Sequence, residues 1–246
     1  MMKGRTAIIT GSGRNIGKAI ALKLAKNGVN VVINGSTNKK DCNAVAEEAQ
    51  SFGAQAIVAM GDIGLRETST ALVNTAIKNF GSVDILVNNA AIRPSSPFLQ
   101  MTHDDWSRVL AVNLEGSFCL AQACIPSMQK KNWGRIINFA GMNAIHGYKG
   151  RAHVSVSKHG CWGLTKALAK EFGPDGITTN IISPGPIETF HDDEEMTHHI
   201  NSMKKRIPLG RLGKPDEIAA AVLLLASDEG AFINGEMIKV NGGTET

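Results

Sequence analysis

A glycine-rich turn between a strand pattern and a helix pattern constrains this chain most. Thr6 to Thr10 is an apolar run of strand length, glycines follow at 11, 13 and 17, and helical periodicity begins at Ile16. Such a turn lets backbone amides and the positive end of the helix approach a pyrophosphate. It therefore predicts a dinucleotide site, with these cofactor-binding residues: Gly11, Ser12, Arg14, Asn15, Ile16 and Gly17.

Strand and helix patterns alternate along the rest of the chain. The expected strands are Thr6 to Thr10, Asn30 to Asn34, Ala56 to Met60, Ile85 to Asn88, Arg135 to Phe139, Thr178 to Ser183 and Glu236 to Val240. Parallel neighbours need right-handed crossovers, so this alternation predicts an α/β fold. We expect a Rossmann-type, doubly wound, parallel seven-stranded sheet with helices on both faces. With 246 residues and no recognisable linker, it should be a single domain over residues 1–246.

The composition of the chain limits the classes of molecule that it is expected to bind. The net charge of +4 is spread without a basic run, so nucleic acid is not an expected partner. No stretch of about twenty apolar residues occurs, so no membrane is expected either. The four cysteines lack C-x-x-C spacing and are interpreted as core residues. These features predict a cytoplasmic protein that acts on a small molecule.

The end of the second strand bears on the choice of coenzyme. Proteins that prefer NAD(H) usually place a carboxylate there for the ribose 2′-hydroxyl. The segment Val31 to Ser36 contains no acid. Arg14 and Ser36 are instead suited to a 2′-phosphate, because a guanidinium forms charge-assisted hydrogen bonds with phosphate. NADP(H) is therefore favoured over NAD(H).

These motifs, and others at matching spacing, resemble the short-chain dehydrogenase/reductase family and its 3-oxoacyl-ACP reductase-like members. The turn fits the family pattern with Asn15 in place of the middle glycine, and asparagine tolerates left-handed backbone. The resemblance implies that Asp62 and Ile63 hold the adenine and that Asn113 serves a proton relay. It also implies cofactor contacts from the following residues: Asn89, Ala90, Lys158, Pro184, Gly185, Ile187 and Thr189.

The family's catalytic pattern is incomplete in this chain. The family has a Tyr-x-x-x-Lys pair and a serine thirteen residues before the tyrosine. Lys158 fits the lysine, but the other two positions hold Val154 and Gly141. Hydride reduction of a carbonyl leaves an alkoxide that needs a proton, and valine has none to give. The chain's one tyrosine is Tyr148, six residues before Val154.

Three readings of this gap remain open. In the first, the chain is an oxidoreductase in which Asn113 and Lys158 are catalytic and Tyr148, His146 or His153 donates the proton. In the second, it is a lyase or isomerase on the same scaffold. In the third, it is a catalytically inactive nucleotide-binding subunit or sensor.

Two expectations concern assembly and the region around the substrate. The resemblance implies a homotetramer formed through the helices Thr102 to Lys131 and Val154 to Phe172 and the last strand. The irregular segment Pro184 to Pro208 follows the sixth strand and is interpreted as a substrate lid. Its part from His191 to His199 lacks ligand spacing such as H-E-x-x-H, so no metal site is predicted.

Overall fold

A parallel sheet forms the centre of the protein. The computed structural model describes residues 2–189 and 203–245. Its strands lie in the order β3-β2-β1-β4-β5-β6-β7. They are β1 (Thr6–Ile9), β2 (Asn30–Ile33), β3 (Ala56–Val58), β4 (Ile85–Asn88), β5 (Gly134–Phe139), β6 (Ile177–Pro184) and β7 (Met237–Val240). Each predicted strand is confirmed, with ends that differ from the prediction by at most two residues.

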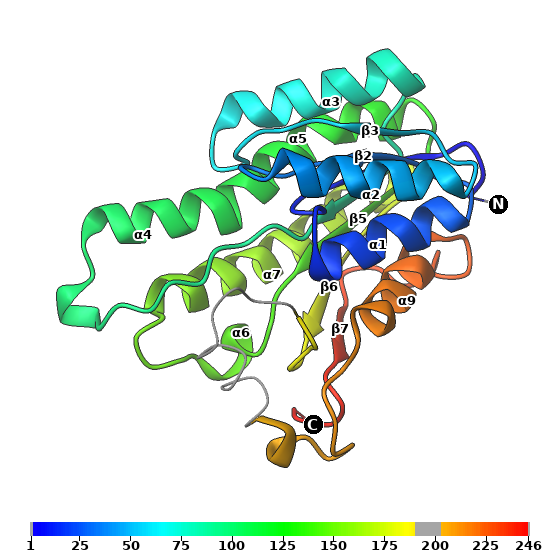
Figure 1. Ribbon diagram of the computed structural model, residues 1–246. Coiled ribbons are helices and arrows are strands. Elements are labelled where there is room, and N and C mark those ends of the chain that lie inside the picture. Colours follow the sequence, from blue (N-terminus) through cyan, green and yellow to red (C-terminus); the bar gives the residue numbers. More distant parts are fainter. Residues whose placement is uncertain (1, 190–202, 246) are drawn as a thin grey trace.

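Helices cover both faces of this sheet (Figure 1). One layer holds α1 (Asn15–Lys26), α2 (Lys39–Ser51) and α9 (Pro215–Ala226), and the other holds α3 (Arg66–Phe80), α5 (Gly116–Gln129) and α7 (Ala152–Phe172). Side chains alternate along β1, so Ala7 and Ile9 enter the first core cluster and Ile8 enters the second. The two separate cores confirm the doubly wound fold.

A long helical stretch precedes β5. It consists of α4 (His103–Leu110), the π-helix η2 (Ala111–Glu115) and α5, where the sequence pattern predicted one helix. Thr102 and Asp105 form a capping box at its start. The stretch His103–Gln129 is long and apolar enough to cross a membrane, but half of its most apolar window is buried in the fold. Core helices pass the same test, so this stretch gives little support to a membrane span.

The chain reverses its direction of winding between β1 and β4, which are neighbours in the sheet. In open α/β sheets, ligands bind at such a switch point beyond the carboxyl ends of the strands. The segments that leave these ends include the turn before α1 and residues 89–97. The short helices are η1 (Phe98–Gln100), α6 (Asn143–His146), η3 (Gly173–Asp175) and η4 (Met203–Arg206). Most of the predicted lid, including His191 to His199, lies outside the described residues.

Candidate functional site

The turn from β1 to α1 has the backbone that the glycine pattern predicts. Gly11 and Asn15 have positive φ angles of 62° and 52°. Asn15 thus occupies the left-handed conformation expected of it at the position of a glycine. A Cβ on Gly17 would lie 2.2 Å from the carbonyl oxygen of Gly11, so a side chain there would displace the turn. The turn therefore leaves a shallow cradle of the kind that a diphosphate requires.

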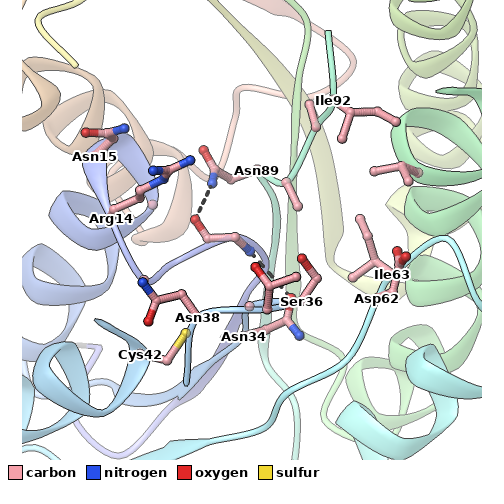
Figure 2. A pocket seen from close by; sticks show the side chains of 18 of the residues that line it. Arg14, Asn15, Asn34, Ser36, Asn38, Cys42, Asp62, Ile63, Asn89 and Ile92 are labelled. Carbon is pink, nitrogen blue, oxygen red and sulfur yellow. Dashed lines mark hydrogen bonds between the residues drawn. The ribbon is translucent and has the colours of Figure 1, made fainter. Parts of the chain in front are cut away.

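Two asparagines tie this turn to neighbouring strands (Figure 2). Asn89 Nδ2 donates to the carbonyl oxygens of Thr10 and Gly11 at 2.9 and 3.1 Å. Asn34 accepts from the amide of Gly11 through Oδ1 at 3.5 Å, and its Nδ2 donates to the carbonyl of Ala59, just after β3. The turn is therefore fixed from both sides before any ligand arrives.

A pocket of about 620 Å³ opens over the turn. Most of the predicted cofactor residues line it, namely Gly11, Arg14, Asn15, Ile16, Gly17, Ser36, Asp62, Ile63, Asn89, Ala90 and Thr189. The pocket thus brings together residues from five separate segments of the chain, those after β1, β2, β3, β4 and β6. Figure 2 shows Arg14 and Asn15 at the start of α1, with Ser36 and Asn38 after β2.

Other predicted residues lie outside this lining. Ser12 is buried, and its hydroxyl donates to the carbonyl of Ile9 at 2.8 Å and accepts from the amide of Asn34 at 3.0 Å. It shapes the turn through its side chain. Ile187 is buried and forms a β-bridge with Gly213. The remaining predicted residues outside the lining are Asn113, Tyr148, Lys158, Pro184 and Gly185.

The pocket's two acids both have partners. Asp62 pairs with Arg108 and accepts from the amide of Gly64 at 2.9 Å. Burial alone would raise the pKa of Asp62, but these hydrogen bonds lower it below its ordinary value. Asp41, in the first turn of α2, accepts from Asn38 Nδ2 at 2.7 Å. No acid follows β2 directly, as the sequence indicates.

Asn113 lies in the π-helix η2. Both ends of its side-chain amide form hydrogen bonds with the segment after β4. Its Oδ1 accepts from the amide of Ile92 at 2.9 Å, and its Nδ2 donates to the Ile92 carbonyl at 3.0 Å. The same Nδ2 lies 3.2 Å from the hydroxyl of Ser157. π-Bulges are frequent at functional sites. Here the bulge positions an asparagine that fixes the floor of the pocket at Ile92.

Lys158 is buried and is the seventh residue of α7. Its ammonium donates to the carbonyl oxygen of Phe139, at the end of β5, over 2.7 Å. Burial lowers the pKa of Lys158 to about 8, and the nearby charge of Arg93 contributes to the shift. A lysine in this state exchanges its proton near neutral pH.

The two positions that differ from the family pattern are well defined. Val154 is 1% exposed and stands one turn before Lys158 on α7. Gly141, just after β5, has a φ of 131°, a conformation that side chains rarely adopt. The missing serine therefore coincides with a backbone conformation that favours glycine.

The three candidate proton donors have different surroundings. Tyr148 is 47% exposed, with its ring centre 5.2 Å from the guanidinium carbon of Arg151. His146 lies with its Nε2 3.2 Å from a carboxylate oxygen of Glu245. His153 is buried, and its Nδ1 accepts from the amide of Val154 at 3.0 Å. Burial is the main cause that lowers the pKa of His153, so its neutral form is favoured.

Several lining residues were not predicted from the sequence. Arg93, Arg108 and Asp41 are the charged ones, and the others are Gly13, Asn34, Gly35, Thr37, Asn38, Cys42, Gly61, Ala91, Ile92 and Val112. Arg93 lies five residues after the end of the predicted strand Ile85 to Asn88, so a basic residue beyond a strand end was the available signal. Arg108 carried no such signal in the sequence, because only folding brings it next to Asp62. Among the described residues, no group of three or more His, Cys, Asp or Glu side chains is arranged for a metal.

Known proteins match nearly the whole length of this chain. A family model described as enoyl-(acyl carrier protein) reductase matches residues 11–245. The chain is 39% identical to the 3-oxoacyl-[acyl-carrier-protein] reductase FabG of Aquifex aeolicus, over 98% of both chains. The chain belongs to the short-chain dehydrogenase/reductase family. The FabG protein of Staphylococcus aureus, at 35% identity over 99% of both chains, is similar as well.

A solved structure supports the same family at the level of the fold. It is described as a short-chain alcohol dehydrogenase of Sinorhizobium meliloti. It matches with a TM-score of 0.92 and 30% identity, over 98% of this chain and 96% of that one. The family resemblance inferred from the motifs is therefore confirmed. The members of this family are typically oxidoreductases, and the two relatives of this chain named above are reductases.

Proposed function

We propose that this chain is an NADP(H)-dependent oxidoreductase that reduces a small carbonyl substrate without the family's tyrosine. The observation that carries the proposal is the pocket, which joins the diphosphate cradle at Gly17 to Arg14 and Ser36. Its lining fits a dinucleotide with a 2′-phosphate, because a guanidinium is present and no carboxylate directly follows β2.

The proposed chemistry assigns a new task to Lys158. When bound, the reduced coenzyme supplies a hydride to the carbonyl carbon, while the carbonyl oxygen needs one proton to become a hydroxyl. We assign this proton to Lys158, because its buried ammonium has a pKa lowered to about 8 by burial. Asn113 fixes Ile92, which lines the pocket. Tyr148, His146 and His153 are the competing donors, to be tested by substitution.

The experiment that tests the proposal combines binding and turnover. Calorimetry with NADPH and NADH on the purified protein should show tight binding of NADPH and weaker binding of NADH. A panel of aldehydes, ketones and enones, including 3-oxoacyl thioesters because the relatives are reductases of that kind, should then reveal oxidation of NADPH.

Each alternative has its own outcome in this experiment. Binding of NADPH without turnover of any substrate would favour the nucleotide-binding subunit or sensor. Turnover of a substrate without a change in the coenzyme would favour a lyase or isomerase. Binding of neither coenzyme would overturn the proposal entirely.

We also propose a homo-oligomer in the cytoplasm. Phe118 on α5 and Val156 on α7 are 46% and 45% exposed, although both are large and apolar. A Cβ on Gly163 of α7 would meet nothing within 4 Å, so that face of the helix is open, whereas Gly160 packs against Leu114 of its own chain. These features support association through α5 and α7, the helices that the family resemblance indicates.

A further inference from the structure

The loop that follows β3 packs against the long helical stretch that precedes β5. A Cβ on Gly64 would lie 2.7 Å from Arg108 Nη1 and 3.1 Å from Val112 Cγ2. A Cβ on Gly116 would lie 2.6 Å from the carbonyl oxygen of Ile63. Helix positions 108, 112 and 116 therefore lie against this loop in succession, and the two glycines allow the close approach. The loop is thus fixed relative to α4 and η2.

Asp62, in this loop, is held at both of its carboxylate oxygens. Its Oδ1 accepts from the amide of Gly64 at 2.9 Å, and its Oδ2 accepts from Nη2 of Arg108. The terminal torsion of an aspartate side chain is broad, so a single anchor leaves the carboxylate able to turn. The second anchor comes from a different element, α4, and together the two fix the plane of the carboxylate.

The pair of Asp62 and Arg108 lines the coenzyme pocket without filling its own hydrogen-bonding capacity. The side chain of Asp62 is 28% exposed and that of Arg108 is 48% exposed. In Figure 2, Asp62 and Ile63 lie to the right, away from Arg14 and Asn15 at the diphosphate cradle. An ion pair this exposed adds little to folding stability. Its effect is therefore on the orientation of the carboxylate in the pocket.

The state of this carboxylate limits the ligand groups that it can bind. Burial alone would raise the pKa of Asp62, but the hydrogen bonds from Arg108 and Gly64 lower it below its ordinary value. The ionised group only accepts hydrogen bonds, and it has about four lone-pair sites, so sites remain beside the two in use. An amino group of a ligand satisfies it, whereas a carbonyl in the same place would set two acceptors against each other.

We propose that Arg108 is a positioning residue for coenzyme binding, which holds Asp62 so that the pocket selects a purine with an exocyclic amino group over one with a carbonyl there. The inference rests on the coenzyme site of the proposed function and adds the residue that sets selectivity for the base. Arg108 acts through Asp62, and a contact of its own with the coenzyme is not required.

The test compares two coenzymes that differ only in this group. Reduced nicotinamide hypoxanthine dinucleotide phosphate carries a carbonyl where NADPH carries the amino group of adenine. Fluorescence titration of the purified protein with each gives the ratio of the two affinities. The wild type should bind NADPH about tenfold more tightly or better, because a hydrogen bond to a charged group is worth that order.

Matched variants at position 108 test the role of the guanidinium. Arg108→Met keeps most of the side-chain length and should reduce the ratio to about threefold or less, mainly because NADPH binds more weakly. Arg108→Lys keeps a charge beside Asp62 and should restore part of the ratio. Arg66→Met removes an exposed arginine that does not line the pocket and should leave the ratio unchanged. Thermal melting shows that each variant is folded.

Two outcomes would overturn the inference. The first is equal affinity of the wild type for the amino and carbonyl coenzymes. The second is a ratio that persists in Arg108→Met, even with both affinities reduced, because Arg108 would then have a structural role only.

Fragments of the coenzyme separate this inference from the proposed function. ADP and IDP carry the same two bases without the nicotinamide. A wild type that prefers ADP to IDP, and loses this preference in Arg108→Met, would support the role of Arg108 even if the protein bound neither NADPH nor NADH. That combination would contradict the proposed function alone.

Discussion

At the scale of single residues, Lys158 combines a family position with an unusual neighbour. In the family pattern it assists a tyrosine, whereas here Val154 occupies the tyrosine's position and is buried. The ammonium donates to the carbonyl of Phe139, and burial lowers its pKa to about 8. The lysine is therefore suited to exchange a proton itself.

The pH dependence of reduction tests this role. Because the lowered pKa is about 8, the ammonium predominates below that pH and the neutral amine above it. Reduction consumes a proton, so its maximal rate should fall as pH rises through about 8, and the reverse oxidation should rise over the same range. Stopped-flow rates between pH 6 and 10 measure this. A rate that does not change with pH would contradict the assignment. A rate that is lost in Tyr148→Phe but retained in Lys158→Met would contradict it as well.

Restoring a tyrosine should help the reaction. Val154→Tyr places a hydroxyl four residues before Lys158, on the same helix face, and a positioned acid is worth roughly 10²- to 10⁴-fold in rate. We expect at least about a tenfold gain in kcat for carbonyl reduction, since part of the effect is lost to overpacking. Val154→Phe is the control of equal bulk without a hydroxyl. An equal response of both variants would show that the gain does not come from the proton.

Arg14 should select the coenzyme. If its guanidinium binds the 2′-phosphate, Arg14→Ala should weaken NADPH about tenfold to hundredfold and leave NADH within about twofold, because only NADPH carries that phosphate. Fluorescence titration of both coenzymes measures the change. Equal weakening of NADPH and NADH would place Arg14 at the diphosphate.

The sequence predicted some site residues and missed others for a physical reason. The turn residues Arg14 to Gly17 follow from local pattern, because one strand, one turn and one helix fix them. Arg93 and Arg151 are 58 positions apart along the chain. The loops that carry them are joined by the hydrogen bond between Ser96 and Gly150, for which the sequence carries no pattern. Ser12 remains a predicted cofactor residue, and the direction of its hydroxyl, which bonds to Ile9 and Asn34, was not predictable from the pattern.

At the scale of elements, periodicity predicted the sheet and the long helices but not the interruption at η2. Strand ends were predicted within two residues, since buried parallel strands are uniformly apolar and end at turn residues. The π-helix around Asn113 has no signature in hydrophobic spacing. It is seen only in the folded chain, where the backbone of residues 111–115 forms the π-helix and Asn113 bonds to Ile92.

Removal of the Asn113 side chain should loosen this element. Asn113→Ala leaves the half-buried amide and carbonyl of Ile92 without their side-chain partner, which costs about 1–3 kcal/mol for each such group at most. We expect a lower melting temperature and weaker coenzyme binding, because Ile92 lines the pocket. Thermal melting with and without NADPH measures both. Asn79→Ala removes an exposed side chain that bonds only within α3, so this control should change neither.

At the scale of the whole molecule, the open apolar faces of α5 and α7 predict self-association. Analytical ultracentrifugation should show a homo-oligomer. The double variant Phe118→Asp and Val156→Asp should dissociate it, because charges would enter an apolar interface. Leu65→Asp alters an equally exposed leucine near α3 and should leave the assembly intact. A monomeric wild type, or an oligomer that survives the double variant, would refute the predicted interface.

The backbone at Gly141 has a consequence for how this site can change. With φ at 131°, the position accepts a side chain only at a cost on the order of 1–3 kcal/mol. A serine introduced alone would carry this backbone cost, although the space around its Cβ is open. Replacement of codon 141 therefore exchanges folding stability for a hydroxyl group, and a neighbouring change that relaxes the loop would offset that loss.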